Sequence, residues 1–377
     1  MTQWLPKGWQ EKKLKDICTI QDGIHTTPNY TDSGIRFISA ENINNIYASN
    51  KFISEEDYNN LYKIKAKKND IFMTRIGDIG TPAVITKDEK LAYYVTISLF
   101  TNISEEVYYL YLYYAMQSYY FQKALYSRTL HAAFPKKINL REIGECKLLL
   151  PPIDEQKRIV NILSLCDDII ENLTKLIEKK ELYKKGVMQR VLTGKARFNG
   201  FNDDWKIKKL SDICKTIKTG KLDANAMEQD GKYRFYTCAK DYYKINTYAF
   251  DGEALLISGN GAYVGYIHYY NGKFNAYQRT YVLMDFTENI KYIKYYLDEY
   301  LKYRIKKERH EGNTPYIVIS TLTDMEIKLP SIEEQKRIAE LLSVIDAEID
   351  NIKKQLELRK LQKKGLMQRL LTGKVRV

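Results

Sequence analysis

Residues 151–197 read PPIDEQKRIVNILSLCDDIIENLTKLIEKKELYKKGVMQRVLTGKAR, and residues 330–376 read PSIEEQKRIAELLSVIDAEIDNIKKQLELRKLQKKGLMQRLLTGKVR. The second segment repeats the first at a constant shift of 179 residues, and 26 of the 47 aligned positions are identical without a gap. A second, weaker repeat lies upstream of each copy: WQEKKLKDIC begins at Trp9 and WKIKKLSDIC begins at Trp205. This alternation of variable and repeated segments is typical of a tandem duplication.

The repeat predicts the domain organisation of the 377-residue chain. We expect a first variable domain at 1–150, a repeated helix at 151–197, a second variable domain at 198–329 and a second repeated helix at 330–377. The end of the second repeat would continue into the start of the chain, as the first repeat continues into the second domain. We therefore predict that the two termini lie within about 30 Å of each other, roughly the diameter of a small domain.

Each repeated segment has the apolar period of one long helix of about 58 Å. Ser331 with Glu334 predicts a capping box for the second copy, and Asp154 is the expected cap of the first. Gly194 and Gly373 stand where glycines end helices. One narrow apolar stripe recurs at steps of three and four residues, at Ile159, Leu163, Cys166, Ile170, Leu173 and Ile177, and again at Ile338, Leu342, Ile345, Ile349, Ile352 and Leu356.

A helix of this length needs a partner to cover its stripe, and the simplest partner is the other copy. Acidic residues such as Asp167 and Asp346 lie in the first half of each segment, and basic residues such as Lys184 and Lys363 in the second half. Antiparallel pairing would set acidic against basic halves and would suit the helix dipoles. The alternative is that each helix packs only on its neighbouring domain.

The variable regions share one order of predicted elements. The first has strands near 35–39, 70–74, 83–86 and 94–100, a tyrosine-rich helix at 104–125, a basic loop at 128–137 and a last strand at 145–150. The second has strands near 234–237, 254–258, 265–270 and 280–285, a helix at 290–307, a loop at 309–315 and a strand at 326–329. The predicted fold class is α+β: two tandem mixed α/β domains, each followed by a long helix, with the helices pairing as an antiparallel coiled coil in pseudo-two-fold symmetry.

Composition favours a folded protein with an acidic partner. Hydrophobic residues make up 44% of the chain and charged residues 28%, and the formal net charge is +13. Nucleic acid is the commonest partner of such a chain. The alternative is that an AT-rich genome raises the lysine and tyrosine content of any protein, and this chain has 32 tyrosines. We find no apolar run of membrane-spanning length and no signal organisation near the start, which indicates a cytoplasmic protein. The five cysteines and four histidines form no metal-binding pattern.

Motifs for chemistry are absent. A DNA methyltransferase would carry a glycine-rich cofactor loop and an Asn/Asp-Pro-Pro-aromatic motif, but Pro151 and Pro152 are followed by Ile153. No GxxxxGK[ST] phosphate loop occurs, and Gly259-Asn260-Gly261 is better explained as a hairpin turn. We interpret the chain as non-catalytic.

The doubled helix start EQKRI, the doubled helix end KKGxMQRxLTGKxR and the alternation of variable with repeated regions resemble the specificity (S) subunit of Type I restriction-modification systems. The variable regions also resemble target recognition domains of that family, in DGIHTTPNYTDSGIRFISAENI from Asp22 to Ile43, in MTRIGDIG from Met73 to Gly80 and in SGNGAYVGYI from Ser258 to Ile267. The resemblance covers the whole chain.

This resemblance implies a protein that binds double-stranded DNA, each domain reading one half of a bipartite, asymmetric target while the helices set the spacing. It implies methyltransferase (M) subunits, usually two, docked on the repeated helices, and restriction/translocase (R) subunits. No cofactor is expected in this chain, because S-adenosylmethionine and ATP would bind those partners.

Base or phosphate readers should be long polar side chains in loops, since arginine reads guanine and asparagine or glutamine reads adenine. His25 and His131 could equally be packed histidines, and we expect the tyrosine-rich helix to be core. The expected readers are His25, Thr27, Arg75, Arg128, His131 and Lys136 in the first domain, and Lys221, Asn260, Gln278, Arg279, Arg309 and Asn313 in the second.

Two other functions stay open at this point. The chain could serve a related fused restriction-modification enzyme in place of a Type I assembly. It could also be a coiled-coil scaffold whose duplicated domains bind protein, with a charge set by genome composition.

Overall fold

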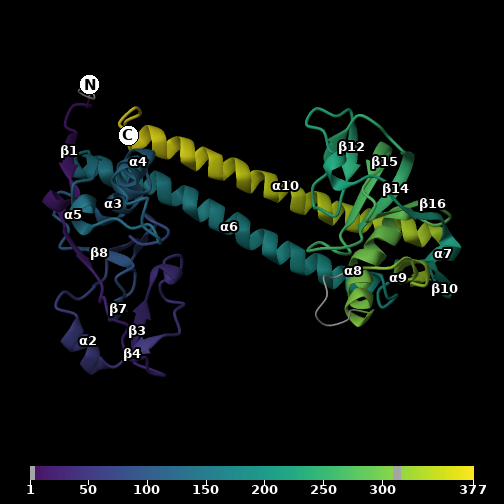
Figure 1. The fold of residues 1–377 in the computed structure, drawn as a ribbon, viewed down its shortest axis with the longest axis horizontal. Coiled ribbons are helices and arrows are strands. Elements are labelled where there is room, and N and C mark those ends of the chain that lie inside the picture. Colours follow the sequence, from purple (N-terminus) through teal and green to yellow (C-terminus); the bar gives the residue numbers. More distant parts are fainter. Residues whose placement is uncertain (1–4, 309–315) are drawn as a thin grey trace. The chain divides into compact units, whose positions relative to one another are not determined.

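The computed structural model describes residues 5–308 and 316–377, which form two compact units. The first contains residues up to 174 together with 355–377, and the second contains 175–354. Each unit therefore holds one variable domain, the first part of one repeated helix and the last part of the other (Figure 1).

Two sheets and several short helices build the first domain. Its four-stranded sheet has the order β2-β8-β5-β6, its three-stranded sheet the order β4-β3-β7, and β1 pairs with β9. In Figure 1 the lobe with β3, β4 and α2 lies apart from the lobe with α3, α4 and α5. The elements are β1 (Gln10–Lys13), α1 (Leu14–Ile17), β2 (Thr19–Asp22), β3 (Ile35–Ile38), β4 (Phe52–Ile53), α2 (Glu55–Leu61), β5 (Ile71–Thr74), β6 (Pro82–Val84), β7 (Leu91–Tyr93), β8 (Ile97–Thr101), α3 (Tyr109–Met116), α4 (Tyr119–Arg128), α5 (Leu140–Gly144) and β9 (Lys147–Leu150).

The four-stranded sheet separates the two cores of the first domain. Successive residues of a strand point to opposite faces, so a fully buried strand such as Ile71–Thr74 can supply both cores. Ile71 and Met73 pack with α3, α4 and the start of the repeated helix, whereas Phe72 packs with β3, β7 and α2.

The second domain is built around one six-stranded sheet with the order β11-β16-β14-β15-β12-β13, and β10 pairs with β17. Leu255 and Leu283 face α8 and the repeated helices, whereas Leu256 and Val282 face a smaller core on the other side. The elements are β10 (Lys206–Lys209), α7 (Leu210–Ile213), β11 (Cys214–Thr219), β12 (Tyr233–Tyr236), β13 (Tyr243–Ile245), β14 (Phe250–Ser258), β15 (Ile267–Ala276), β16 (Thr280–Phe286), α8 (Ile290–Glu308), α9 (Ile319–Thr323) and β17 (Glu326–Leu329).

Both repeated segments form helices of 39 residues, α6 (Ile153–Val191) and α10 (Ile332–Leu370). Acidic and basic halves meet within each unit, because Lys363 pairs with Asp167 in the first unit and Lys184 pairs with Asp346 in the second. The apolar stripe is buried at Ile159, Leu163, Ile338 and Leu342.

The helix ends agree with the sequence in part. Gly194 and Gly373 adopt φ angles of +73° and +68°, as expected for glycines after a helix. Ser331 accepts a hydrogen bond from the Glu334 amide, but the Glu334 side chain binds elsewhere, so the capping box is incomplete. The expectation for Asp154 is wrong, because α6 already begins at Ile153.

The tyrosine-rich helix is interrupted, contrary to expectation. The segment forms α3 and α4 in place of one helix, because the Ser118 side chain accepts from the Phe121 amide and starts a new helix. Tyr111 is fully buried and donates to the Leu149 carbonyl, and Tyr114 donates to Asp167. These tyrosines are core residues, as predicted.

The ends of the described chain meet within the first unit, as predicted. Arg376 donates to the Lys7 carbonyl at 3.0 Å. A Cβ atom at Gly373 would lie 2.4 Å from the Pro6 ring, so this close approach needs a glycine.

Candidate nucleic-acid interface

A repeated set of polar contacts holds each variable domain on the long helices. In the first unit, buried Glu155 accepts two hydrogen bonds from Arg376 and one from the Trp9 indole. In the second unit, buried Glu334 accepts two hydrogen bonds from Arg197. Charge-assisted paired bonds of this kind fix geometry as well as adding stability.

The next residue along each helix is a buried glutamine, and it makes equivalent hydrogen bonds in the two units. Gln156 accepts from the Tyr108 amide and donates to the Pro151 carbonyl, and Gln335 accepts from the Asn289 amide and donates to the Pro330 carbonyl. The buried glutamines therefore tie the strand before each long helix to the start of α3 in the first domain and to the start of α8 in the second.

Arg75 lies at the centre of a cluster of loops in the first domain, formed by the segments around Asp22, Val95 and Ile138. Its guanidinium donates to Asp22 at 3.1 Å and to the carbonyls of Val95 and Ile138 at 3.0 and 3.2 Å. Arg75 is only 7% exposed, and burial lowers the pKa of its guanidinium while Asp22 opposes that shift. The structure therefore does not support Arg75 as a free base reader, because its donors already hold three loops together.

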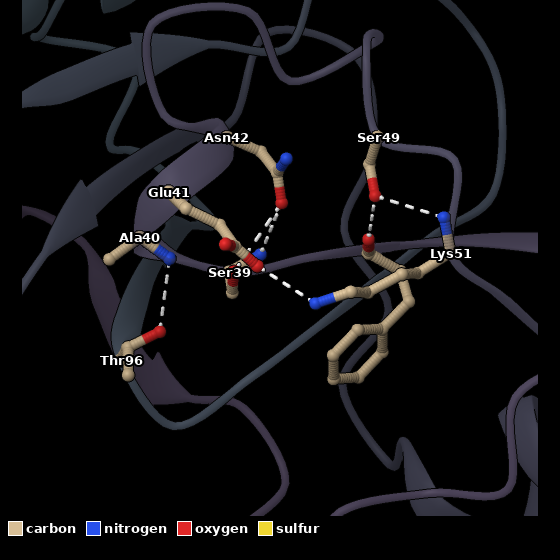
Figure 2. A network of polar contacts seen from close by, with 8 residues as sticks. Ser39, Ala40, Glu41, Asn42, Ser49, Lys51 and Thr96 are labelled. Carbon is tan, nitrogen blue, oxygen red and sulfur yellow. Dashed lines mark hydrogen bonds and ion pairs between the residues drawn. The ribbon is translucent and has the colours of Figure 1, made fainter. Parts of the chain in front are cut away.

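A second network extends this cluster (Figure 2). The Ser39 amide and hydroxyl both donate to the Asn42 side chain, and the Ala40 amide donates to the Thr96 hydroxyl. The Thr96 carbonyl in turn accepts from the Arg75 amide. The turn after β3 is therefore fixed to the loop that carries Arg75.

His25 lies at the edge of this cluster and is oriented by Asp22, whose carboxylate lies 2.9 Å from its Nε2 atom. Its side chain is 72% exposed, so His25 is not a packed histidine. Thr27 is also exposed. Asp22 was not predicted from the sequence, although its spacing of three residues before His25 is a usable signal.

Lys136 and His131 line a hollow of about 590 Å³ together with Gly77 and Tyr126. The Gly77 amide donates to the Lys136 carbonyl, and the His131 ring lies on Tyr126 with centroids 4.4 Å apart. Arg128 is outside this hollow, donates to the Ala124 carbonyl and lines a larger one of about 910 Å³ beside α4. Arg128 therefore lines a different hollow from His131 and Lys136.

In the second domain, three of the predicted readers come together. Asn260, Gln278 and Arg279 line one hollow of about 430 Å³ together with Tyr316 and Ile317. Gln278 and Arg279 are exposed, and the Gln278 amide group donates to Asp223. Two separate segments of the second domain therefore place amide and guanidinium groups around one hollow.

Of the other predicted readers of this domain, Lys221 does not line the hollow. Lys221 is exposed on the loop after β11. Arg309 and Asn313 lie outside the described residues.

Within residues 5–308 and 316–377, no group of three or more histidine, cysteine, aspartate or glutamate side chains could hold a metal ion. In the same residues, no helix combines the length and apolarity needed to cross a bilayer.

Comparisons with known proteins agree with this arrangement. The family described as "Type I restriction modification DNA specificity domain" matches residues 6–181 and 202–360. The specificity subunit of the Type I restriction enzyme EcoDI from Escherichia coli is 45% identical over 157 residues, which are 41% of this chain and 34% of that protein. The match thus spans about a third of that relative's length.

A second relative aligns over more of the chain. The MjaVIII specificity subunit of Methanocaldococcus jannaschii is 30% identical over 305 residues, which are 71% of this chain and 70% of that protein. A crystal structure of the S subunit of a Type I restriction-modification system from M. genitalium shares the fold, with a TM-score of 0.65, 17% identity and 98% of both chains covered. The resemblance inferred from the sequence is confirmed: the chain belongs to the Type I restriction-modification specificity family and carries two copies of its DNA specificity domain.

Proposed function

We propose that each variable domain reads one half of a bipartite, asymmetric DNA target for a Type I restriction-modification assembly. The observation that carries this proposal is that both domains are anchored by the same Glu–Arg contacts but present different loop surfaces. Glu155 with Arg376 and Glu334 with Arg197 anchor the domains through the same paired hydrogen bonds. The hollows differ, because the first presents His131 and Lys136 and the second presents Asn260, Gln278 and Arg279.

The long helices would set the distance between the half-sites. We propose that α6 and α10 pair along their length as an antiparallel coiled coil, which would give the chain pseudo-two-fold symmetry. The matched ion pairs Asp167–Lys363 and Lys184–Asp346 support this pairing. Readers related in this way would face half-sites about one helical turn of DNA apart, roughly 34 Å.

The repeated helices would also dock methyltransferase subunits, usually two. Leu165 and Val344 occupy equivalent positions in the two copies and are 61% and 59% exposed, and the equivalent Leu182 and Leu361 are 71% and 65% exposed. Exposed apolar side chains at equivalent positions favour one kind of partner that binds twice.

The chain itself would be non-catalytic. Methyltransferase subunits would bind S-adenosylmethionine and flip and methylate adenine, and restriction/translocase subunits would use ATP. In this division of labour, the residues of this chain choose the sequence on which the partners act.

Selection from a random-sequence duplex library tests the proposal. The full chain, with and without its cognate methyltransferase, should enrich a motif of two short half-sites separated by a fixed unspecified spacer. A single contiguous motif would contradict recognition by two separate domains. No enrichment by a folded complex would favour the protein scaffold.

A further inference from the structure

A basic and aromatic hollow of about 430 Å³ lies on β12, β13 and β15 of the second domain, apart from the hollow that holds Asn260 and Arg279. Its lining includes four cationic side chains and three tyrosines: Lys232, Arg234, Lys244, Lys273, Tyr233, Tyr242 and Tyr270. Lys273 stands opposite Asp251 in the β14–β15 ladder. Among the described residues, no carboxylate forms an ion pair with the other three cations.

Arg234 is held in a fixed position inside this hollow. Its guanidinium carbon lies 4.3 Å from the centre of the Tyr242 ring and 4.4 Å from that of Tyr270, so two aromatic faces flank the plane. One N–H group donates to the Tyr236 hydroxyl at 3.3 Å. A guanidinium has five N–H donors. In the part of the chain that the structure describes, the other four have no protein acceptor, which leaves its edge open to a ligand.

Such an arrangement selects a ligand with several anionic oxygens. Stacking restricts the guanidinium to one plane, and a flat fork of donors matches phosphate oxygens. Lys232 and Lys244 are exposed beside it and add mobile positive charge. Cations gathered without carboxylate partners repel one another, and an anionic ligand relieves that repulsion.

We infer that this hollow binds phosphate groups of the DNA backbone next to the half-site that the second domain reads. The inference rests on the proposed function. Strand β12 joins the two hollows, because Arg234 lies near its start and the Tyr236 carbonyl at its end accepts from the Tyr277 amide, next to Gln278 and Arg279. At about 3.3 Å per residue, four strand residues span roughly 10 Å. That length corresponds to about three steps of 3.4 Å along one DNA strand.

The test uses the double variant Lys232→Gln/Lys244→Gln, because both lysines are exposed and neither is part of the core. Fluorescence anisotropy would measure its binding to a duplex that carries the selected motif and to an unrelated duplex, across a range of salt. Affinity should fall about equally for both duplexes, by roughly tenfold at low salt. The slope of log K against log salt should become shallower by about 0.9 for each phosphate that the variant no longer neutralises.

The matched control is Lys206→Gln/Lys328→Gln, which removes the same charge from exposed positions on β10 and β17 of the same domain. Its salt slope should equal that of the unsubstituted chain. Equal slopes for both double variants, or a weakening confined to the motif duplex, would overturn the inference. The inference would also be overturned if the Lys232/Lys244 variant bound DNA as the unsubstituted chain does but was no longer stabilised against heat by inorganic phosphate.

Arg234→Lys provides a second variant that keeps the charge but removes the flat donor fork. We expect it to weaken binding to both duplexes by a few-fold, and its thermal unfolding would check that the domain is intact. Failure of the proposed function is distinguishable, because the unsubstituted chain would then show no preference for any duplex. Preference for the motif with an unaltered salt slope in the double variant would reject only the phosphate site.

Discussion

The guanidinium of Arg376 binds the carboxylate of Glu155 through two hydrogen bonds of 3.0 and 2.7 Å, although 221 positions separate the two residues. Arg197 and Glu334 form the same paired contact in the second unit, at 3.0 and 2.7 Å. In both cases the arginine follows the end of one repeated helix and the glutamate starts the other. The duplication thus reproduces one joint in each unit.

Arg376→Ala should lower the free energy of unfolding of the first unit. The Glu155 side chain is 3% exposed and would keep its charge without the partner that compensates it. Urea denaturation would measure the destabilisation. Arg359→Ala is the matched control, because Arg359 is an exposed arginine of the same unit that donates to Gln362 rather than to Glu155. Equal destabilisation in both variants would show that the joint carries no special stability.

Acid should weaken this joint. Burial raises the pKa of Glu155, but hydrogen bonds from Arg376 and Trp9 outweigh burial and leave the pKa below its ordinary value of 4.5. The stabilisation is therefore complete above about pH 4.5 and is lost as the pH falls through the lowered value. Below about pH 4.5, unfolding free energy should fall more steeply for the unsubstituted chain than for Glu155→Gln. The exposed-site variant Glu340→Gln should keep the original slope; identical slopes in all three would contradict the assignment.

Arg75 should contribute to the stability of the first domain, whereas His25 should contribute to DNA recognition. Arg75→Ala removes the donor shared by Asp22 and two carbonyls, and should destabilise the first domain by about 3 kcal/mol. His25→Ala removes a mostly exposed side chain, so stability should be unchanged while one position of the first half-site relaxes. Thermal unfolding and motif selection on both variants would check this pair. A stable Arg75→Ala protein with a relaxed motif would restore Arg75 as a reader.

Arg279→Ala should relax one position of the second half-site and leave the first half-site unchanged. Arg279 shares its hollow with Asn260 and Gln278, and one paired contact to guanine is worth about 1–3 kcal/mol of discrimination. Sequencing of selected duplexes would measure the change. A uniform fall in affinity for all sequences would identify Arg279 as a phosphate contact instead.

The repeat and the apolar period were sufficient to predict the long helices, since α6 and α10 begin within two residues of the expected starts. Strand β17 at Glu326–Leu329 was also predicted correctly. The break between α3 and α4 was missed, because a single capping serine interrupts an otherwise continuous apolar pattern. Strands β1, β2, β10 and β11 were missed because they are short and rich in polar residues.

The sites were harder to predict for a physical reason. The sequence identifies long polar residues in loops, but it does not show which of these side chains form hydrogen bonds within the fold and which stay free to bind a ligand. Arg75 was expected at the surface and is instead bonded within the loop cluster. Lys232 and Arg234 were overlooked because they lie on or beside a strand, where only the pairing of β12 with β13 and β15 gathers their charges.

The most direct test of the central claim is to map modified adenines genome-wide by long-read sequencing, after co-expressing this chain and its neighbouring methyltransferase in a methylation-free host. A single motif of two half-sites with a fixed spacer, present only when both proteins are expressed, is the predicted result. Absence of methylation despite a purified, stable complex would contradict the claim that these domains select DNA sequence.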